Sequence, residues 1–171
     1  MATIQELLQE LEQEAPSTRR VLERIPQDRL DWKPHEKSMS LGQLALHVAT
    51  LPRAIADVST RPTFDVRTNV PRPSPASVAE VLSVLEASVQ AAKEILGGMD
   101  DAALAMPWRM MAGDREVMAL TRSGLLRTVL FNHWYHHRGQ LTVYLRLLGV
   151  PLPAVYGTSA DENPIAQPAA R

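Results

Sequence analysis

The sequence contains no cysteine, and this absence excludes several kinds of chemistry at once. Without thiols the chain can form no disulfide, use no thiolate nucleophile and hold no zinc ion through sulfur. A metal site in this protein must therefore use nitrogen and oxygen ligands. At 171 residues the chain is most simply one domain, and it is long enough to bury a sizeable core without a metal or a disulfide.

An excess of charge of one sign and a long apolar run are also missing. Lys and Arg total 18 against 19 Asp and Glu, a net charge of -1, so the composition gives no support to nucleic-acid binding. No run approaches the roughly 18 apolar residues of a membrane span. The N-terminus, MATIQELLQELEQEA, carries glutamates where a signal peptide has basic residues. We expect a cytoplasmic protein with no nucleic-acid and no membrane partner.

Four segments carry apolar residues at spacings of three and four, which is typical of amphipathic helices. Ser40 is a candidate N-cap for the second segment, Ser74 or Ser77 for the third, and Gly149 ends the fourth. Pro52 predicts an irregularity inside the second helix. The predicted helices cover residues 4–25, 41–59, 78–96 and about 123–148.

The segments between these helices complete the predicted fold. Residues 60–75 hold four prolines and predict a long crossover connection, while residues 107–120 predict a short hairpin around Gly113 and Asp114. The fold class is therefore all-α, a four-helix bundle with a long crossover and a short hairpin before the last helix. We expect one domain over residues 1–160 and a flexible C-terminal tail over residues 161–171.

Three of the five histidines lie in HWYHHRGQ, residues 133–140. When the apolar stripe of the last helix is extended at steps of three and four, it places His133 and His137 on the inward face and His136 to one side. Two histidines four residues apart stack on one face of a helix, which is a spacing that metal sites on helices use. His35 lies in a polar loop, where we expect it to be solvated.

A third inward histidine lies on the second helix, where His47 falls between Leu44 and Leu51 in the apolar stripe. Taken alone, such a histidine is more often a core residue hydrogen-bonded to a carbonyl than a metal ligand. The pair on the last helix is harder to explain in this way, because an apolar interior offers few partners for two imidazoles. Three inward histidines on two helices favour a metal site.

Two segments of the sequence resemble the DinB family of bacterial metal-binding four-helix bundles. They are WKPHEKSMSLGQLALHVA and HWYHHRGQLTVYLRLLGVPLPAVYGTSADE. In that family one histidine of the second helix and a His-x-x-x-His pair of the last helix bind a divalent ion, commonly zinc or nickel. The resemblance implies that His47, His133 and His137 hold one such ion per chain, and that the protein is a homodimer.

Three imidazole ligands leave coordination positions open for water or substrate, as in catalytic zinc sites. Members of the family include thiol-dependent transferases and isomerases. We therefore expect a metal-dependent transferase or hydrolase acting on a small molecule, with bound water or a thiol as the nucleophile. The alternative is a non-catalytic metal-binding bundle in stress response or ligand sensing. The sequence assigns no catalytic acid or base, and the candidates are Gln43, Tyr156, Asp161 and Glu162.

Overall fold

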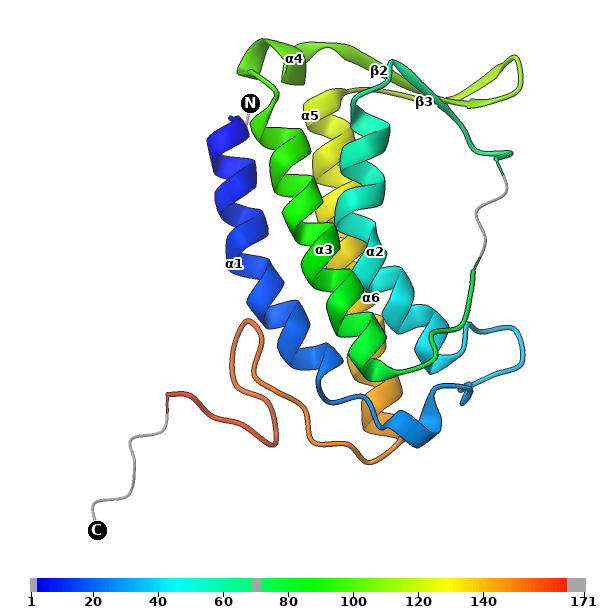
Figure 1. Cartoon of the computed structure of the whole chain (residues 1–171), viewed down its shortest axis with the longest axis vertical. Helices are drawn as coiled ribbons and strands as arrows, with labels where there is room; N and C mark the ends of the chain where they lie inside the picture. The colour runs from blue at the N-terminus through cyan, green and yellow to red at the C-terminus, as the bar shows by residue number, and fades with distance from the viewer. Residues whose placement is uncertain (1–2, 69–71, 166–171) are drawn as a thin grey trace.

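The computed structural model describes residues 3–68 and 72–165, and it is mostly helical with one small sheet (Figure 1). Four long helices lie side by side and enclose the apolar core. They are α1 (Ile4–Leu22), α2 (Leu41–Ser59), α3 (Val78–Gly97) and α6 (His133–Leu147). The shorter elements are η1 (Gln27–Arg29), β1 (Thr63–Asp65), α4 (Asp101–Ala105), β2 (Pro107–Ala112), β3 (Arg115–Thr121), α5 (Arg122–Leu125) and η2 (Leu126–Asn132).

The helices begin where the sequence predicts them. Ser40 caps α2 by accepting a hydrogen bond from the backbone N–H of Gln43, and Ser77 caps α3 in the same way from Glu80. Such side-chain caps satisfy backbone donors that have no partner within the helix. No helix in the described parts of the chain is long and apolar enough to cross a membrane.

The prediction of an all-α fold omits the sheet. The hairpin is confirmed, since β2 and β3 pair antiparallel on either side of Gly113. A third strand, β1, lies inside the proline-rich connection and pairs parallel to β2, with Phe64 opposite Met110. A strand of three residues is too short to show alternation in the sequence. Residues 69–71 of the connection lie outside the described residues.

The last predicted helix is interrupted by a π-helical segment. Helical structure runs from α5 through η2 to α6, and the turns of η2 (Leu126–Asn132) are π-helical. A π-helical turn accommodates extra residues and shifts the face that the following residues present. Leu126, Leu130 and Phe131 are buried in this segment. η2 therefore sets the direction in which the histidines of α6 point.

Pro52 breaks the hydrogen-bond pattern inside α2. Because proline has no N–H, the carbonyl of Val48 loses the donor that normally lies four residues further along the helix. The indole N–H of Trp134 on α6 donates to this carbonyl at 2.9 Å. Both residues are fully buried. The proline thus frees an acceptor in α2 that joins it to α6.

A second contact, from α3, satisfies backbone groups of α2 on either side of Pro52. The Oγ of Ser88 on α3 accepts a hydrogen bond from the backbone N–H of Arg53 at 3.0 Å and donates to the carbonyl of Thr50 at 3.2 Å. Ser88 is itself buried. α2 is therefore held near Pro52 by a polar side chain from each of two neighbouring helices.

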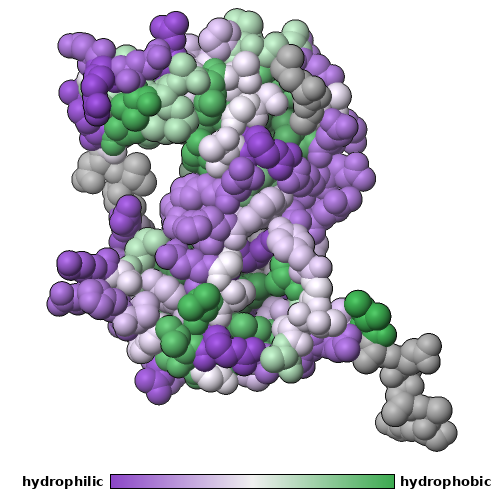
Figure 2. All heavy atoms as spheres, turned by 180° about the vertical axis from the view of Figure 1, so that it is seen from behind, coloured by the Kyte–Doolittle hydropathy of each residue, from purple (hydrophilic) through white to green (hydrophobic). Residues whose placement is uncertain are grey.

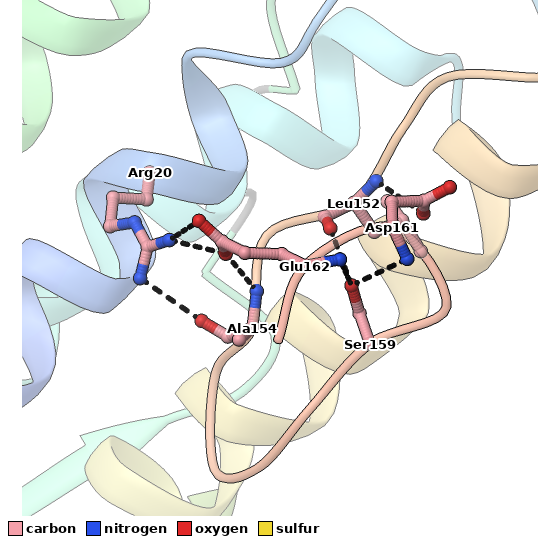
Figure 3. A network of polar contacts seen from close by, with 6 residues as sticks. All are labelled: Arg20, Leu152, Ala154, Ser159, Asp161 and Glu162. Carbon is pink, nitrogen blue, oxygen red and sulfur yellow. Dashed lines mark hydrogen bonds and ion pairs between the residues drawn. The ribbon is translucent and has the colours of Figure 1, made fainter. Parts of the chain in front are cut away.

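The end of the chain folds back against α1 (Figure 3). Glu162 accepts hydrogen bonds from the guanidinium of Arg20 on α1 and from the backbone N–H of Ala154. The Oγ of Ser159 accepts from the backbone N–H groups of Asp161 and Glu162. Two residues assigned to the predicted tail thus hold the segment that precedes them.

The domain boundary at residue 160 stays a prediction. Asp161 also forms an ion pair with Arg146 of α6 and accepts a hydrogen bond from the backbone N–H of Leu152 at 2.9 Å. Residues 166–171 of the predicted tail lie outside the described residues.

Replacing Trp134 with Phe should lower the free energy of unfolding by about 1–3 kcal/mol, because the buried Val48 carbonyl loses its donor. Pro52→Ala restores an N–H within α2, so Trp134→Phe should cost about 1 kcal/mol less in that background. Urea unfolding of the wild type, the two single variants and the double variant measures this coupling. Effects that add to within about 0.3 kcal/mol would show that Pro52 and Trp134 act independently.

Candidate metal centre

Three histidines meet between α2 and α6. His47 comes from α2, His133 and His137 come from successive turns of α6, and one nitrogen atom from each lies within 4.8 Å of the others. The Nε2 atoms of His133 and His137 are 2.7 Å apart. The ring of His47 stands edge-on to both, with centroids 5.3 and 4.6 Å away. The three residues expected to be ligands are therefore in one place, and their binding of a metal stays a prediction.

The partners of the two α6 histidines orient their rings. The Nδ1 of His137 lies 2.9 Å from the Oε1 of Gln140, which can only accept, so Nδ1 carries the proton. A hydrogen bond with the backbone of Val129 opposes the effect of burial on the pKa of His133. With the Nδ1 of His137 protonated, its Nε2 presents a lone pair to the Nε2 of His133, and a proton or a cation fits between the two nitrogens. The donor set therefore fits a metal ion.

Burial keeps the three imidazoles neutral. Burial and, to a smaller extent, charge repulsion from His137 and His133 lower the pKa of His47 to about 4. Burial also lowers the pKa of His133 and of His137 below the usual value. Since only the neutral ring has a lone pair for a metal, the three nitrogens stay available at pH 7 and compete with protons only under acidic conditions.

The remaining two histidines lie apart from this group, as their positions in the sequence predict. His136 is exposed, and its ring packs against that of His137 with centroids 4.9 Å apart. His35 is exposed in the loop before α2, where its Nδ1 accepts a hydrogen bond from the backbone N–H of Lys37. Neither belongs to the three-histidine group.

A cavity of about 900 Å³ opens beside the histidines, and His47 and His133 form part of its wall. Most of its lining is apolar and comes from α2, the sheet and η2. Figure 2 shows the molecule from behind, with hydrophilic residues in a band across the middle of this face. None of the described residues that line the cavity is Asp or Glu. A carboxylate for acid–base catalysis is therefore absent from this part of the described structure.

Of the four candidates for a catalytic acid or base, only Gln43 lines the cavity. Asp161 and Glu162 hold the C-terminal segment through Arg146 and Arg20. The hydroxyl of Tyr156 is hydrogen-bonded to Glu14 and to Arg138, away from the histidines. Gln43 is a neutral amide and cannot exchange protons near neutral pH.

Arg138 lies beside the histidines on α6 but faces away from them. It is only 2% exposed and forms an ion pair of 2.6 Å with Glu14 of α1. The same guanidinium donates to the Oγ1 of Thr18 at 3.1 Å. α6 therefore presents this residue to α1 rather than to solvent or to the cavity.

Two functional contacts were not identified from the sequence, namely those of Gln140 and Val129. Gln140 follows His137 by three residues, so the two side chains are neighbours on α6. That spacing is a usable signal for a residue that orients a histidine. The carbonyl of Val129 gives no such signal, because its direction depends on the π-helical geometry of η2.

Replacing Gln140 with Ala should weaken metal binding by about tenfold to a hundredfold, because the His137 ring loses the acceptor that fixes its tautomer and orientation. Competition with a chromophoric chelator measures the affinity. Gln90→Ala is the matched control, since Gln90 hydrogen-bonds only to Glu94 on the exposed surface of α3. Equal metal affinities for the two variants would contradict the role assigned to Gln140.

Comparisons with solved structures find proteins with a similar fold. A DinB-like protein from Bacillus cereus has a similar structure, with a TM-score of 0.73 and 26% identity over 90% of this chain and 98% of that one. A DinB-like protein from Bacillus subtilis, YjoA, gives a TM-score of 0.67 with 22% identity over 88% of this chain and 96% of its own.

Sequence comparison gives a short match and a long one. The uncharacterized protein YrdA of Bacillus subtilis is 42% identical over 40 residues, which are 23% of this chain and 24% of that protein. This chain therefore matches about a quarter of the length of YrdA. The family model described as "DinB family" matches residues 1–166. Because that match spans nearly the whole sequence, the chain belongs to the DinB family.

Proposed function

We propose that this protein binds one divalent ion per chain, zinc or nickel, through His47, His133 and His137. The observation that supports this most strongly is the convergence of three neutral imidazole nitrogens within 4.8 Å of one another. Imidazole suits zinc and nickel alike, and three such ligands leave at least one position open. The ion is held inside one chain, between α2 and α6 of a four-helix bundle.

We further propose that the protein is a metal-dependent transferase or hydrolase for a small molecule. A divalent ion in an open site supplies Lewis acidity and generates a water or thiol nucleophile at neutral pH. The chain contributes orientation, since Gln140 and the Val129 carbonyl fix the rings of His137 and His133. The apolar cavity beside His47 limits the access of bulk water and accommodates a substrate.

The second candidate function is metal binding without turnover, in stress response or ligand sensing. The observation that favours it is the lack of a carboxylate among the described residues that line the cavity. An enzyme of this kind would have to rely on the nucleophile at the metal and on acids or bases carried by the substrate. Turnover of electrophiles with a panel of thiols by the metal-loaded protein separates the two functions.

Alanine at any one of His47, His133 and His137 should reduce the metal content from about one ion per chain to nearly none, because two imidazoles hold a divalent ion weakly. Elemental analysis after mild purification is the measurement. His136→Ala is the matched control on the same helix and should keep the full metal content, since its ring is exposed. Full metal in all three ligand variants would contradict the site.

We propose that the protein is a cytoplasmic homodimer whose metal sites lie within each chain. Val143 and Leu147 are 57% and 62% exposed on α6, and an interface between two copies would cover them. If the sites lie within one chain, a mixture of His47→Ala and His133→Ala chains should form dimers that hold no metal. Recovery of about one site per mixed dimer, which is about a quarter of a site per chain in a random equal mixture, would show that the ligands cross the interface.

A further inference from the structure

Part of the wall of the cavity beside the histidines is apolar. Phe64 of β1 and Met110 of β2 are paired neighbours in the sheet, and both side chains line the cavity. Trp108 of β2 and Ile55 of α2 extend this wall. The part of a ligand that lies against the wall is therefore apolar, because no described residue there offers a hydrogen-bond partner apart from the indole of Trp108, which donates to Val58.

The side chains of the protein contribute positive charge to the cavity through two arginines, Arg67 and Arg72, without a lining carboxylate among the described residues. Arg67 is neutralised, since its guanidinium forms an ion pair of 2.6 Å with Asp65. Arg72 differs, because within residues 3–68 and 72–165 no carboxylate lies within ion-pair distance of its guanidinium. The cavity therefore carries one uncompensated positive charge.

Contacts with α2 place this charge near the histidines. The Nε2 of Gln43 donates to the carbonyl of Arg72 at 3.1 Å, while its Oε1 accepts from the backbone N–H of Ser40 at the start of the helix. Arg72 is thereby tied to the first turn of α2, one turn before His47. Arg72, His47 and His133 all line the same cavity.

We propose that the cavity binds a small amphipathic carboxylate, whose charged group pairs with Arg72 and whose apolar part packs against Phe64 and Met110. A carboxylate matches a single free guanidinium, because the two groups form paired, parallel hydrogen bonds. The inference rests on the proposed function in one respect, since it takes the histidines as the place where the bound molecule reacts.

The test uses 4-phenylbutyrate as the probe and 4-phenylbutanol as its uncharged analogue. In calorimetric titrations, the wild-type protein as purified should bind the carboxylate at least about tenfold more tightly than the alcohol. Arg72→Gln should weaken carboxylate binding by about tenfold to a hundredfold, the range expected for a charge-assisted hydrogen bond. Binding of the alcohol should not change, which also shows that the variant is folded.

Arg67→Gln is the matched control, because it makes the same substitution in the same cavity at an arginine that Asp65 already neutralises. Its carboxylate affinity should stay within about threefold of the wild type. Equal binding of carboxylate and alcohol, no detectable binding of the carboxylate, or equal losses in the two arginine variants would each overturn the inference.

The titrations are repeated on chelator-treated protein, so that a failure of this inference can be distinguished from a failure of the proposed metal site. Binding that depends on Arg72 in the metal-free protein supports the carboxylate site even if the histidines prove to hold no metal. Conversely, a protein that holds metal through three histidines but binds the carboxylate without help from Arg72 retains the proposed metal site and loses the carboxylate site.

Discussion

The hydrogen bond between the indole of Trp134 and the carbonyl of Val48 is the contact on which the site depends most. His47 precedes Val48 on α2, and His133 precedes Trp134 on α6, so the bond joins the immediate neighbours of two proposed ligands. It is made possible by Pro52, which removes the normal donor of that carbonyl. Pro52 weakens α2 internally, and it thereby allows the hydrogen bond that fixes the register of α2 against α6.

The charged residues follow a division between two sides of α6. Toward α1, Arg138 pairs with Glu14, and Arg127 pairs with Glu10 at 2.6 Å. These pairs satisfy the polar groups that η2 and α6 present to α1 and leave little charge uncompensated. Toward the cavity, Arg72 has no such partner within the described residues. The potential on the cavity side is thus the more positive of the two.

The sequence predicts the long helices and the grouping of the histidines, because both depend on periodic spacing along a helix. Ser40 and Ser77 are identified by the same reasoning, since capping is a local effect. β1 cannot be predicted from the sequence, because three residues carry no periodic signal and its pairing with β2 is a contact between distant segments. The position of Arg72 cannot be predicted for a related reason. Arg72 is held by a hydrogen bond from Gln43, and this contact depends on the tertiary fold.

The π-helical turns of η2 mark a segment in which the insertion or deletion of a single residue would change the structure in a simple way. Each residue of an α-helix turns the chain by about 100°. The loss or gain of one residue within Leu126–Asn132 would therefore rotate α5 and the β2–β3 hairpin relative to α6, while the spacing between His133 and His137 stayed the same. Evolution can in this way reshape the wall of the cavity without altering the histidines, so relatives that share the three histidines can differ in the cavity beside them.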